Sequence, residues 1–148
     1  MGKSKEEIRA GAKVFGQAAN TLGVFGQAAL KADDFMGKEI IAQNIIPSIV
    51  LKAFSCELFL KSLVTDEVKK VHKLNELFEH LKESDRQAIK SSVISKLTIK
   101  IDGYDETNFE EDLADVANAF VDWRYFYEEP RSIKMEFLNV LFDVLWKY

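Results

Sequence analysis

The sequence predicts an all-α protein, an antiparallel bundle of about five to six helices in a single domain that spans residues 1–148. Three observations predict this fold. Apolar residues recur three and four positions apart along most of the chain, as on helices that pack against a core. Ser or Thr precedes Glu or Gln by three residues at three places, which is the pattern of a capping box at a helix start. Only two prolines occur in 148 residues, so long helices can form.

Composition indicates an ordinary soluble domain, with 47% hydrophobic and 30% charged residues. The net charge of −4 argues against a general affinity for nucleic acid or anionic membranes, although it leaves room for a small basic patch. The single Cys56 cannot form an internal disulfide, so we expect a small buried hydrophobe in a reducing compartment. No apolar run has the length of a signal peptide core or a membrane span. We therefore expect a cytoplasmic protein with no membrane segment.

The first helix is expected from residue 4 to about residue 30, beginning at the capping box of Ser4 and Glu7. The segment VFGQAA occurs at 14–19 and again ten residues later. Ten residues rotate a helix by about 1000°, which leaves the two copies roughly 80° apart and not on one stripe. The glycines of this helix predict either a close approach of another helix or a break near Gly23.

A connection at 31–38 leads to a second helix at 39–64. Pro47 should kink this helix or begin its main part, since proline suits a first helical turn. Glu57 falls among apolar residues on one face, with Lys61 one turn further on. An exposed pair at this spacing contributes about 0.2–0.5 kcal/mol, whereas a buried Glu57 would need a stronger partner.

A third helix is predicted at 67–83, with a clear apolar seam. A capping box of Ser84 and Gln87 then begins a fourth helix. The stretch 97–101 alternates and is rich in β-branched residues, so it predicts either a short strand or a frayed helix end. The dipeptide at 102–103, Asp-Gly, is a turn signal.

A fifth helix is expected at 107–128, with a capping box of Thr107 and Glu110. Arg124 falls on its apolar face among aromatic residues. A guanidinium keeps its charge inside a protein, so Arg124 needs a partner or water at this position.

Glu57 is the other charge that interrupts an apolar face, and we expect it to contact Arg124 directly or through one water. Tyr127 or His72 would join the pair. One interpretation is a buried ion pair that holds two helices in register. The other is a polar site in a cleft between helices or between subunits.

The last helix, at 132–148, has apolar residues over most of its circumference and only a narrow polar stripe. Such a helix is either central to the bundle or covered by a partner chain. We expect a homodimer that uses this helix, with Leu138, Phe142 and Trp146 at the contact.

No motif for a metal or cofactor is present. A di-iron bundle would carry Glu three residues before His on two helices, but Lys69 precedes His72 and Leu77 precedes His80 at that distance. No hydrolase or protease signature supports a nucleophile, although the sequence alone leaves a Ser/His/Asp or Cys/His set open. We expect no cofactor and no metal, and the sequence identifies no catalytic residue.

Three segments, AFSCELFLKSLV at 53–64, VHKLNELFEHL at 71–81 and FVDWRYFYE at 120–128, resemble the HEPN superfamily of all-α domains. The shared features are a Glu and a Lys one turn apart, a His-x-Leu-x-x-Leu-Phe stretch, and an Arg followed by aromatic residues. They fall on Ala53, Glu57, Lys61, His72, Leu74, Leu77, Phe78, Arg124, Tyr125 and Tyr127. The resemblance covers about residues 40–130. It implies a helical bundle that dimerises, of the kind found in toxin–antitoxin and anti-phage systems.

Catalytic members of that superfamily are metal-independent ribonucleases that use Arg-x(4–6)-His. Here Glu129, Pro130 and Arg131 occupy the positions after Arg124 where the histidine would stand. The resemblance therefore implies a non-catalytic module that binds a protein partner, RNA or a nucleotide, with Arg124 as a phosphate or partner contact. The alternatives are a ribonuclease whose histidine comes from elsewhere, such as His72, and a purely structural dimer.

Overall fold

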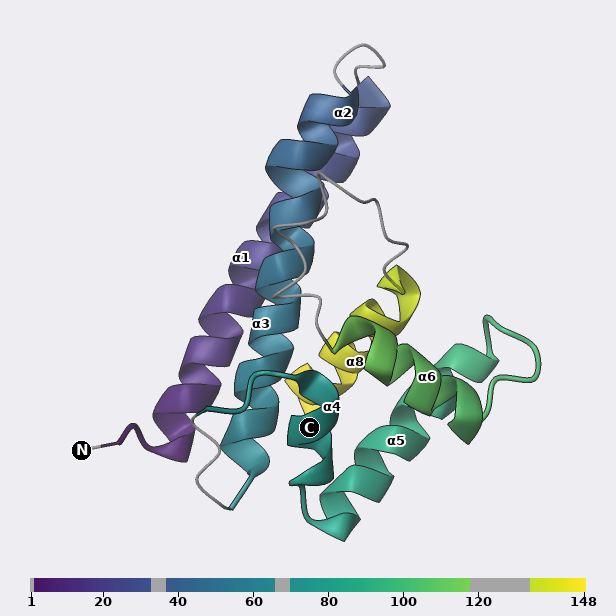
Figure 1. Cartoon of the computed structure of the whole chain (residues 1–148). Coiled ribbons are helices and arrows are strands. Elements are labelled where there is room, and N and C mark those ends of the chain that lie inside the picture. The colour runs from purple at the N-terminus through teal and green to yellow at the C-terminus, as the bar shows by residue number, and fades with distance from the viewer. Residues whose placement is uncertain (1, 33–36, 66–69, 118–133) are drawn as a thin grey trace.

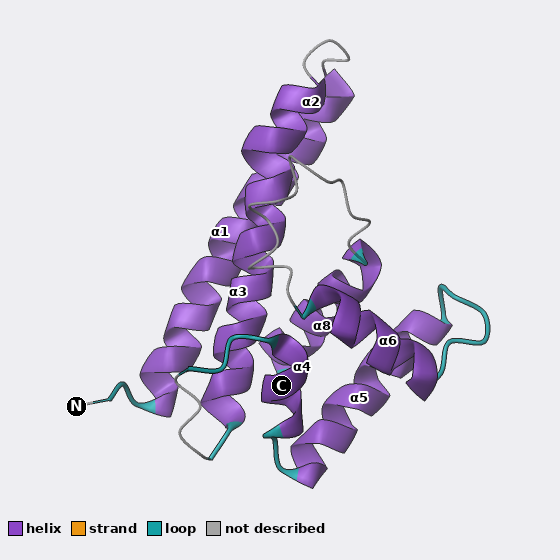
Figure 2. Ribbon diagram, in the orientation of Figure 1, coloured by secondary structure: helices purple, strands orange, loops and turns teal. Residues whose placement is uncertain are grey.

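The computed structural model describes residues 2–32, 37–65, 70–117 and 134–148. These residues form helices and connecting loops without any strand, as Figure 2 shows, which confirms the predicted all-α bundle. The helices are α1 (Lys5–Ala32), α2 (Gly37–Ile40), the π-helical turn η1 (Ile41–Ile45), α3 (Ile46–Leu63), α4 (Leu74–Glu79), α5 (Glu83–Thr98), α6 (Glu106–Val116) and α8 (Met135–Lys147).

A long hairpin of α1 and α3 forms one side of the molecule, with the two helices antiparallel and α2 at the far end (Figure 1). Small residues line the contact between them. Ser48 Oγ donates to the carbonyl of Ala19 and Ser55 Oγ donates to the carbonyl of Ala12, both at 2.6 Å. The serine side chain is short, so its hydroxyl reaches a backbone carbonyl of the neighbouring helix only when the two helices lie very close together.

Two glycines of α1 lie in close contact with neighbouring elements, Gly16 with α8 and Gly26 with η1. A Cβ at Gly16 would lie 2.8 Å from ring atoms of both Phe142 and Trp146, and one at Gly26 would lie 2.4 Å from Ile45 Cδ1. The helix continues unbroken past Gly23. Of the two uses predicted for the glycines, close approach is therefore the one that the structure shows.

Pro47 stands in the first turn of α3, directly after η1. Proline has no amide hydrogen, and its ring clashes with the carbonyl four residues earlier. The preceding turn widens instead, and the amide of Ile46 bonds to the carbonyl of Ile41 in the i to i+5 pattern of a π-helix. The chain is therefore helical without interruption from α2 through η1 and past Pro47 into α3.

The last helix, α8, lies at the centre of the molecule, between the hairpin and the layer formed by α5 and α6 (Figure 1). Leu138 is 1% exposed and Phe142 3% exposed. Phe59 of α3 meets the rings of Phe142 and Trp146 edge-on, with centroid separations of 6.5 and 5.9 Å.

The position of α8 bears on whether this apolar helix is central to the bundle or covered by a partner chain. The chain's own helices bury Leu138 and Phe142 and partly cover Trp146, so most of the apolar surface of α8 is hidden without a second chain. The homodimer itself stays a prediction, and its surface must be sought elsewhere.

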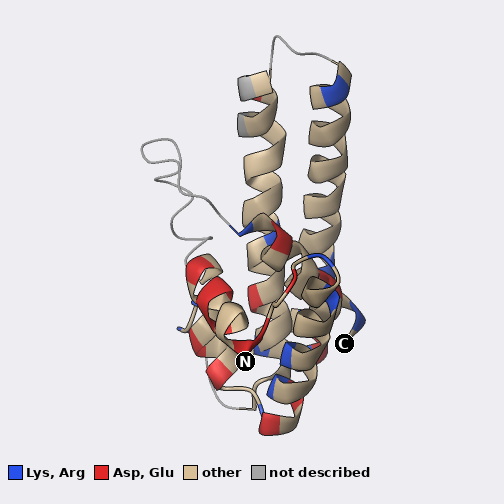
Figure 3. Ribbon diagram, turned by 90° about the vertical axis from the view of Figure 1, so that its right-hand side faces the viewer, with Lys and Arg blue, Asp and Glu red and all other residues tan. Residues whose placement is uncertain are grey.

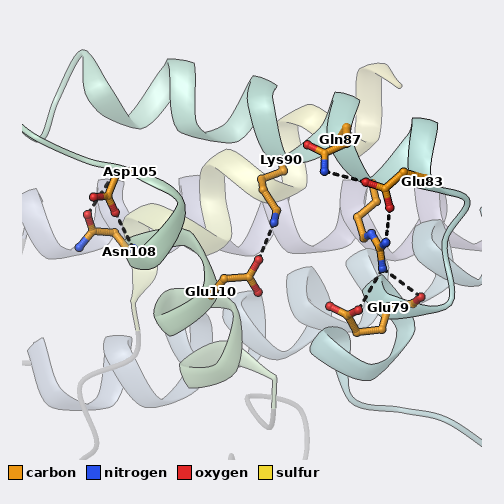
Figure 4. A network of polar contacts seen from close by, with 8 residues as sticks. Glu79, Glu83, Gln87, Lys90, Asp105, Asn108 and Glu110 are labelled. Atoms are coloured by element: carbon orange, nitrogen blue, oxygen red, sulfur yellow. Dashed lines mark hydrogen bonds and ion pairs between the residues drawn. The ribbon is translucent and has the colours of Figure 1, made fainter.

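Ion pairs on the outside connect α4, α5 and α6 (Figure 4). Arg86 of α5 lies 3.0 Å from Glu79 of α4, and Lys90 of α5 lies 2.6 Å from Glu110 of α6. Because the carboxylates of these pairs are largely exposed, water screens the pairs and they contribute little to stability.

The helix starts differ from the predicted ones at two of three places. The box of Ser4 and Glu7 is confirmed, with its two hydrogen bonds at 2.7 and 3.2 Å. The box predicted at Thr107 is wrong, because the N-cap residue of α6 is Asp105, two residues earlier. Asp105 accepts from the amide of Asn108 at 3.1 Å, and the Asn108 side chain accepts from the amide of Asp105 at 3.0 Å (Figure 4).

The box at Ser84 is also wrong, because α5 already includes Glu83. Ser84 lies inside the first turn, and the Gln87 side chain donates to Glu83 Oε1 at 2.8 Å instead (Figure 4). The Gln87 side chain, which the predicted box would have paired with Ser84, is thus bonded to Glu83.

One further boundary was misplaced. The helix predicted at 67–83 is shorter, since α4 occupies only Leu74–Glu79 and residues 71 to 73 before it are not helical, while 67–69 lie outside the described residues. Of the two alternatives predicted for 97–101, the structure shows the helix end and not the strand, because α5 runs to Thr98 and a turn follows. Of the helix predicted at 107–128, the structure describes the part up to residue 117.

Candidate functional site

Glu57 of α3 is buried, with 2% of its surface exposed, and it gathers two of the residues predicted with it. Its Oε1 atom lies 2.8 Å from Lys61 Nζ and 3.0 Å from His72 Nδ1. Lys61 follows one turn later on α3, and His72 comes from the segment between α3 and α4. Arg124 and Tyr127, the other predicted members, lie outside the described residues, so their contact with Glu57 stays a prediction.

The second carboxylate oxygen, Glu57 Oε2, has no hydrogen-bond partner among the described residues. A buried polar atom in this state is unusual, because it has lost water without gaining a donor. The carboxylate is therefore able to accept one more hydrogen bond, and a donor of positive charge would suit it best.

The contact with Glu57 favours one tautomer of His72. An ionised carboxylate only accepts hydrogen bonds, so with Glu57 ionised the hydrogen between the two groups is on Nδ1 of the imidazole. In the neutral form of that ring the other nitrogen, Nε2, carries no hydrogen. Since 56% of the His72 side chain is exposed, this arrangement presents a proton acceptor to solvent.

Neither a metal nor a thiolate accompanies this cluster in the described part of the chain. No group of three or more His, Cys, Asp or Glu side chains there could hold a metal ion. Cys56, next to Glu57 in sequence, points into the core, and burial strongly raises the pKa of its thiol. Its predicted role as a small hydrophobe agrees with this environment.

A second candidate site is a groove of about 760 Å³ between α1, α3 and α8. Lys52 of α3 lies within it and donates to Asn139 Oδ1 of α8 at 2.7 Å. Its ammonium is also 5.3 Å from the centre of the Phe142 ring. Burial lowers the pKa of Lys52, while the charge of Asp143 acts in the opposite direction.

Sequence reasoning missed the groove. Lys52 and Asn139 are both polar residues on otherwise apolar helices, which was the only available signal. The two are separated by 87 positions, so their pairing follows from the packing of α8 on α3 and not from any local pattern.

A third feature is the outer face of α1, opposite α3. From residue 14 to residue 30 this helix carries no charged residue. Val14 and Phe25 are 62% and 68% exposed, and Ala18 and Thr21 between them are exposed as well. We call these four residues the outer stripe. Figure 3 shows the corresponding uncharged stretch of the hairpin in tan, below the charged residues at its upper end.

Comparisons of the chain with models of protein families, with curated proteins and with solved structures find no match. None of the described helices combines the length and the apolar character that a membrane crossing needs. The function must therefore be argued from the three features above.

Proposed function

We propose that this chain is a non-catalytic, HEPN-like interaction module whose protein partner is a second copy of itself, bound through the outer stripe of α1. The observation that carries the proposal is the exposure of large apolar side chains on an uncharged helix face. Exposed patches of this kind mark interaction surfaces, whereas single exposed apolar residues are ordinary.

The outer stripe is self-complementary, which favours a second copy over an unrelated partner. Its members are spaced by four, three and four residues, a pattern that is symmetric about its midpoint. In an antiparallel pair related by a twofold axis, Val14 of one chain would meet Phe25 of the other, and Ala18 would meet Thr21. The small central residues permit close approach of the two helices, and a twofold contact is the commonest kind in oligomers.

The helix dipoles favour the same orientation. An antiparallel pair opposes the dipoles of the two α1 helices, whereas a parallel pair aligns them side by side. The charged residues of α1 lie outside the uncharged stretch from residue 14 to residue 30, so they do not interrupt the contact.

Sedimentation velocity tests the proposal, with the protein between about 1 and about 100 µM, the range in which a dimer of modest affinity dissociates. The wild type should be a dimer and the double variant Val14→Glu, Phe25→Glu a monomer with an unchanged helical circular dichroism spectrum. Ile99→Glu is the control, because Ile99 is also apolar and even more exposed, at 85%, but lies after α5. A monomeric wild type, or a dimer that survives the double variant, contradicts the proposal.

A metal-independent ribonuclease is the second candidate, and the Glu57–His72 contact is the observation that favours it. In that reaction His72 Nε2 would take the proton of a ribose 2′-hydroxyl, whose oxygen attacks phosphorus while the 5′-oxygen leaves with a proton from water. An RNA cleavage assay with a metal chelator decides the matter. A ribonuclease of this kind requires activity in the wild type and in His80→Gln, and loss of activity in His72→Gln and Glu57→Gln. Inactive wild-type protein rejects it.

A further inference from the structure

The groove between α1, α3 and α8 has the composition of a ligand site. Its volume of about 760 Å³ lies within the range typical of small-molecule pockets, about 300–1,000 Å³. Apolar side chains form most of its wall, among them Val24, Ile45, Ile49 and Leu138. Lys31 and Lys52 are its only charged residues among those described, so no acidic side chain lines it.

The two lysines stand at opposite ends. Lys52 is beside α8, at the same end as Ala19 of α1, and Lys31 closes α1 at the other end. Twelve residues of helix separate Ala19 from Lys31, which corresponds to about 18 Å at 1.5 Å per residue. The groove is therefore elongated, with an apolar middle.

Lys52 has hydrogen-bonding capacity to spare. An ammonium group has three N–H donors, and Lys52 uses one of them on Asn139 Oδ1. No described carboxylate lies within ion-pair distance of it. Asp143 acts on Lys52 only through its charge, without forming an ion pair, so the hydrogen bond of the ammonium goes to an amide and leaves two donors for an anion.

We propose that this groove binds a single-chain amphiphile with a carboxylate head, such as a medium-chain fatty acid. The carboxylate pairs with Lys52 at the α8 end, beside the Asn139 amide, and the alkyl chain lies along Val24, Ile45 and Ile49. One ammonium at the head position suits one negative charge, which favours a carboxylate over a phosphate dianion. This site is independent of the outer stripe, since the two occupy different faces of α1.

Displacement of a fluorescent dansyl-labelled undecanoate by decanoate tests the proposal, with decanol as the neutral competitor of equal chain length. The wild type should bind decanoate at least about tenfold more tightly than decanol, the difference expected for a charged hydrogen bond. Lys52→Met should remove that preference, while Lys52→Arg should keep it. Lys96→Met, which changes an exposed lysine of α5, is the matched control and should behave as wild type.

A second variant tests the position of the chain. Gln27 lines the groove but is exposed, so Gln27→Trp should fill the groove without disturbing the core, and it should weaken decanoate and decanol alike. Thermal unfolding of each variant checks that it folds. The proposal is overturned if decanoate fails to displace the probe, if decanol binds equally well to the wild type, or if Gln27→Trp leaves both affinities unchanged.

Discussion

Among single residues, Glu57 has the most demanding environment. Its carboxylate is buried, Lys61 and His72 share one oxygen, and the other oxygen lacks a described donor. The loss of water from a carboxylate costs several kcal/mol, and one exposed imidazole together with one lysine offsets only part of this cost. A third, cationic donor would complete the site, and Arg124 is the residue that the sequence offers.

We therefore predict that Glu57 and Arg124 are energetically coupled. If the pair is buried, Arg124→Ala should reduce the free energy of unfolding by about 3–5 kcal/mol, because an uncompensated carboxylate would remain. The combination of Glu57→Gln with Arg124→Met should recover part of that loss. Urea denaturation of Glu57→Gln, of Arg124→Met and of their combination measures the coupling.

Arg86→Ala is a suitable control, since the carboxylates that pair with Arg86 are exposed and the loss of these pairs should change stability little. Strictly additive effects of the changes at Glu57 and Arg124 would show that the two residues do not meet. Arg124 would then be a residue whose aliphatic part covers the core.

The glycines of α1 provide a second prediction at the scale of the residue. Gly16→Ala should destabilise the protein, because the new methyl group would collide with Phe142 and Trp146 inside the core, at a cost of about 1–3 kcal/mol. Gly11→Ala should stabilise it by up to about 1 kcal/mol, since the nearest atom to the new Cβ is Leu58 Cδ1 at 3.7 Å and alanine favours the helix. Thermal unfolding with both variants side by side would reveal opposite shifts in Tm. Equal shifts would contradict the close packing at Gly16.

At the scale of the elements, caps determine where helices begin. The start of α6 offers two overlapping boxes, Asp105 with Asn108 and Thr107 with Glu110, and the chain uses the first. Aspartate carries a full negative charge at the positive end of the helix, so it is the stronger cap. Glu110 is then available to pair with Lys90 of α5. The ion pair between Lys90 and Glu110 thus favours the cap at Asp105 over the one at Thr107.

Asp105→Ala should accordingly reduce stability by about 1 kcal/mol, with a range of about 0.5–2 kcal/mol for the loss of such a cap. Thr107→Ala should change it by only a few tenths, because Thr107 lies in the first turn of α6 and caps nothing. Guanidinium denaturation at neutral pH distinguishes the two variants. A larger effect at Thr107 would restore the box that the sequence first suggested.

Periodicity was sufficient to predict α1, α3, α5 and α8, and the all-α class followed from them. It was insufficient wherever two local signals competed, as at Thr107 and Ser84, or where a short apolar seam suggested more helix than the chain forms, as before α4. Pro47 gave two alternatives, and the structure shows the second, because Pro47 lies in the first turn of α3, after the π-helical turn.

The candidate sites divide in the same way. Glu57 with Lys61 could be predicted because the two residues are one helical turn apart, and His72 was included because Glu57 needed a partner. The Lys52–Asn139 contact could not be predicted, since it depends on which faces of α3 and α8 meet. The exposure of the outer stripe likewise depends on which face of α1 is turned to α3.

At the scale of the whole molecule, one continuous core joins α1, α3, α4, α5, α6 and α8, and Cys56 lies within it without exposure. Burial raises the pKa of the Cys56 thiol, so the folded protein holds almost no thiolate at neutral pH.

We predict that Cys56 reports global unfolding. A disulfide reagent such as Ellman's should react with it at the rate at which the core opens, and the protection should disappear above the urea midpoint. Cys56→Ser is the blank for the assay. Rapid labelling of native protein would mean that α3 separates from its neighbours locally, without unfolding of the whole domain.

The small residues between α1 and α3 have a consequence for register. Ala12, Ala19 and Gly26 recur every seven residues on α1, and Ser48, Ser55 and Ser62 recur every seven on α3. If one helix slid past the other by seven residues, serines would again face alanines, so the hairpin alone does not define its own alignment. The aromatic side chains of α8 distinguish the possible alignments of α1 and α3, because only one alignment places Gly16 against Phe142 and Trp146. The most distant helix in the chain thus sets the alignment of the first two long ones.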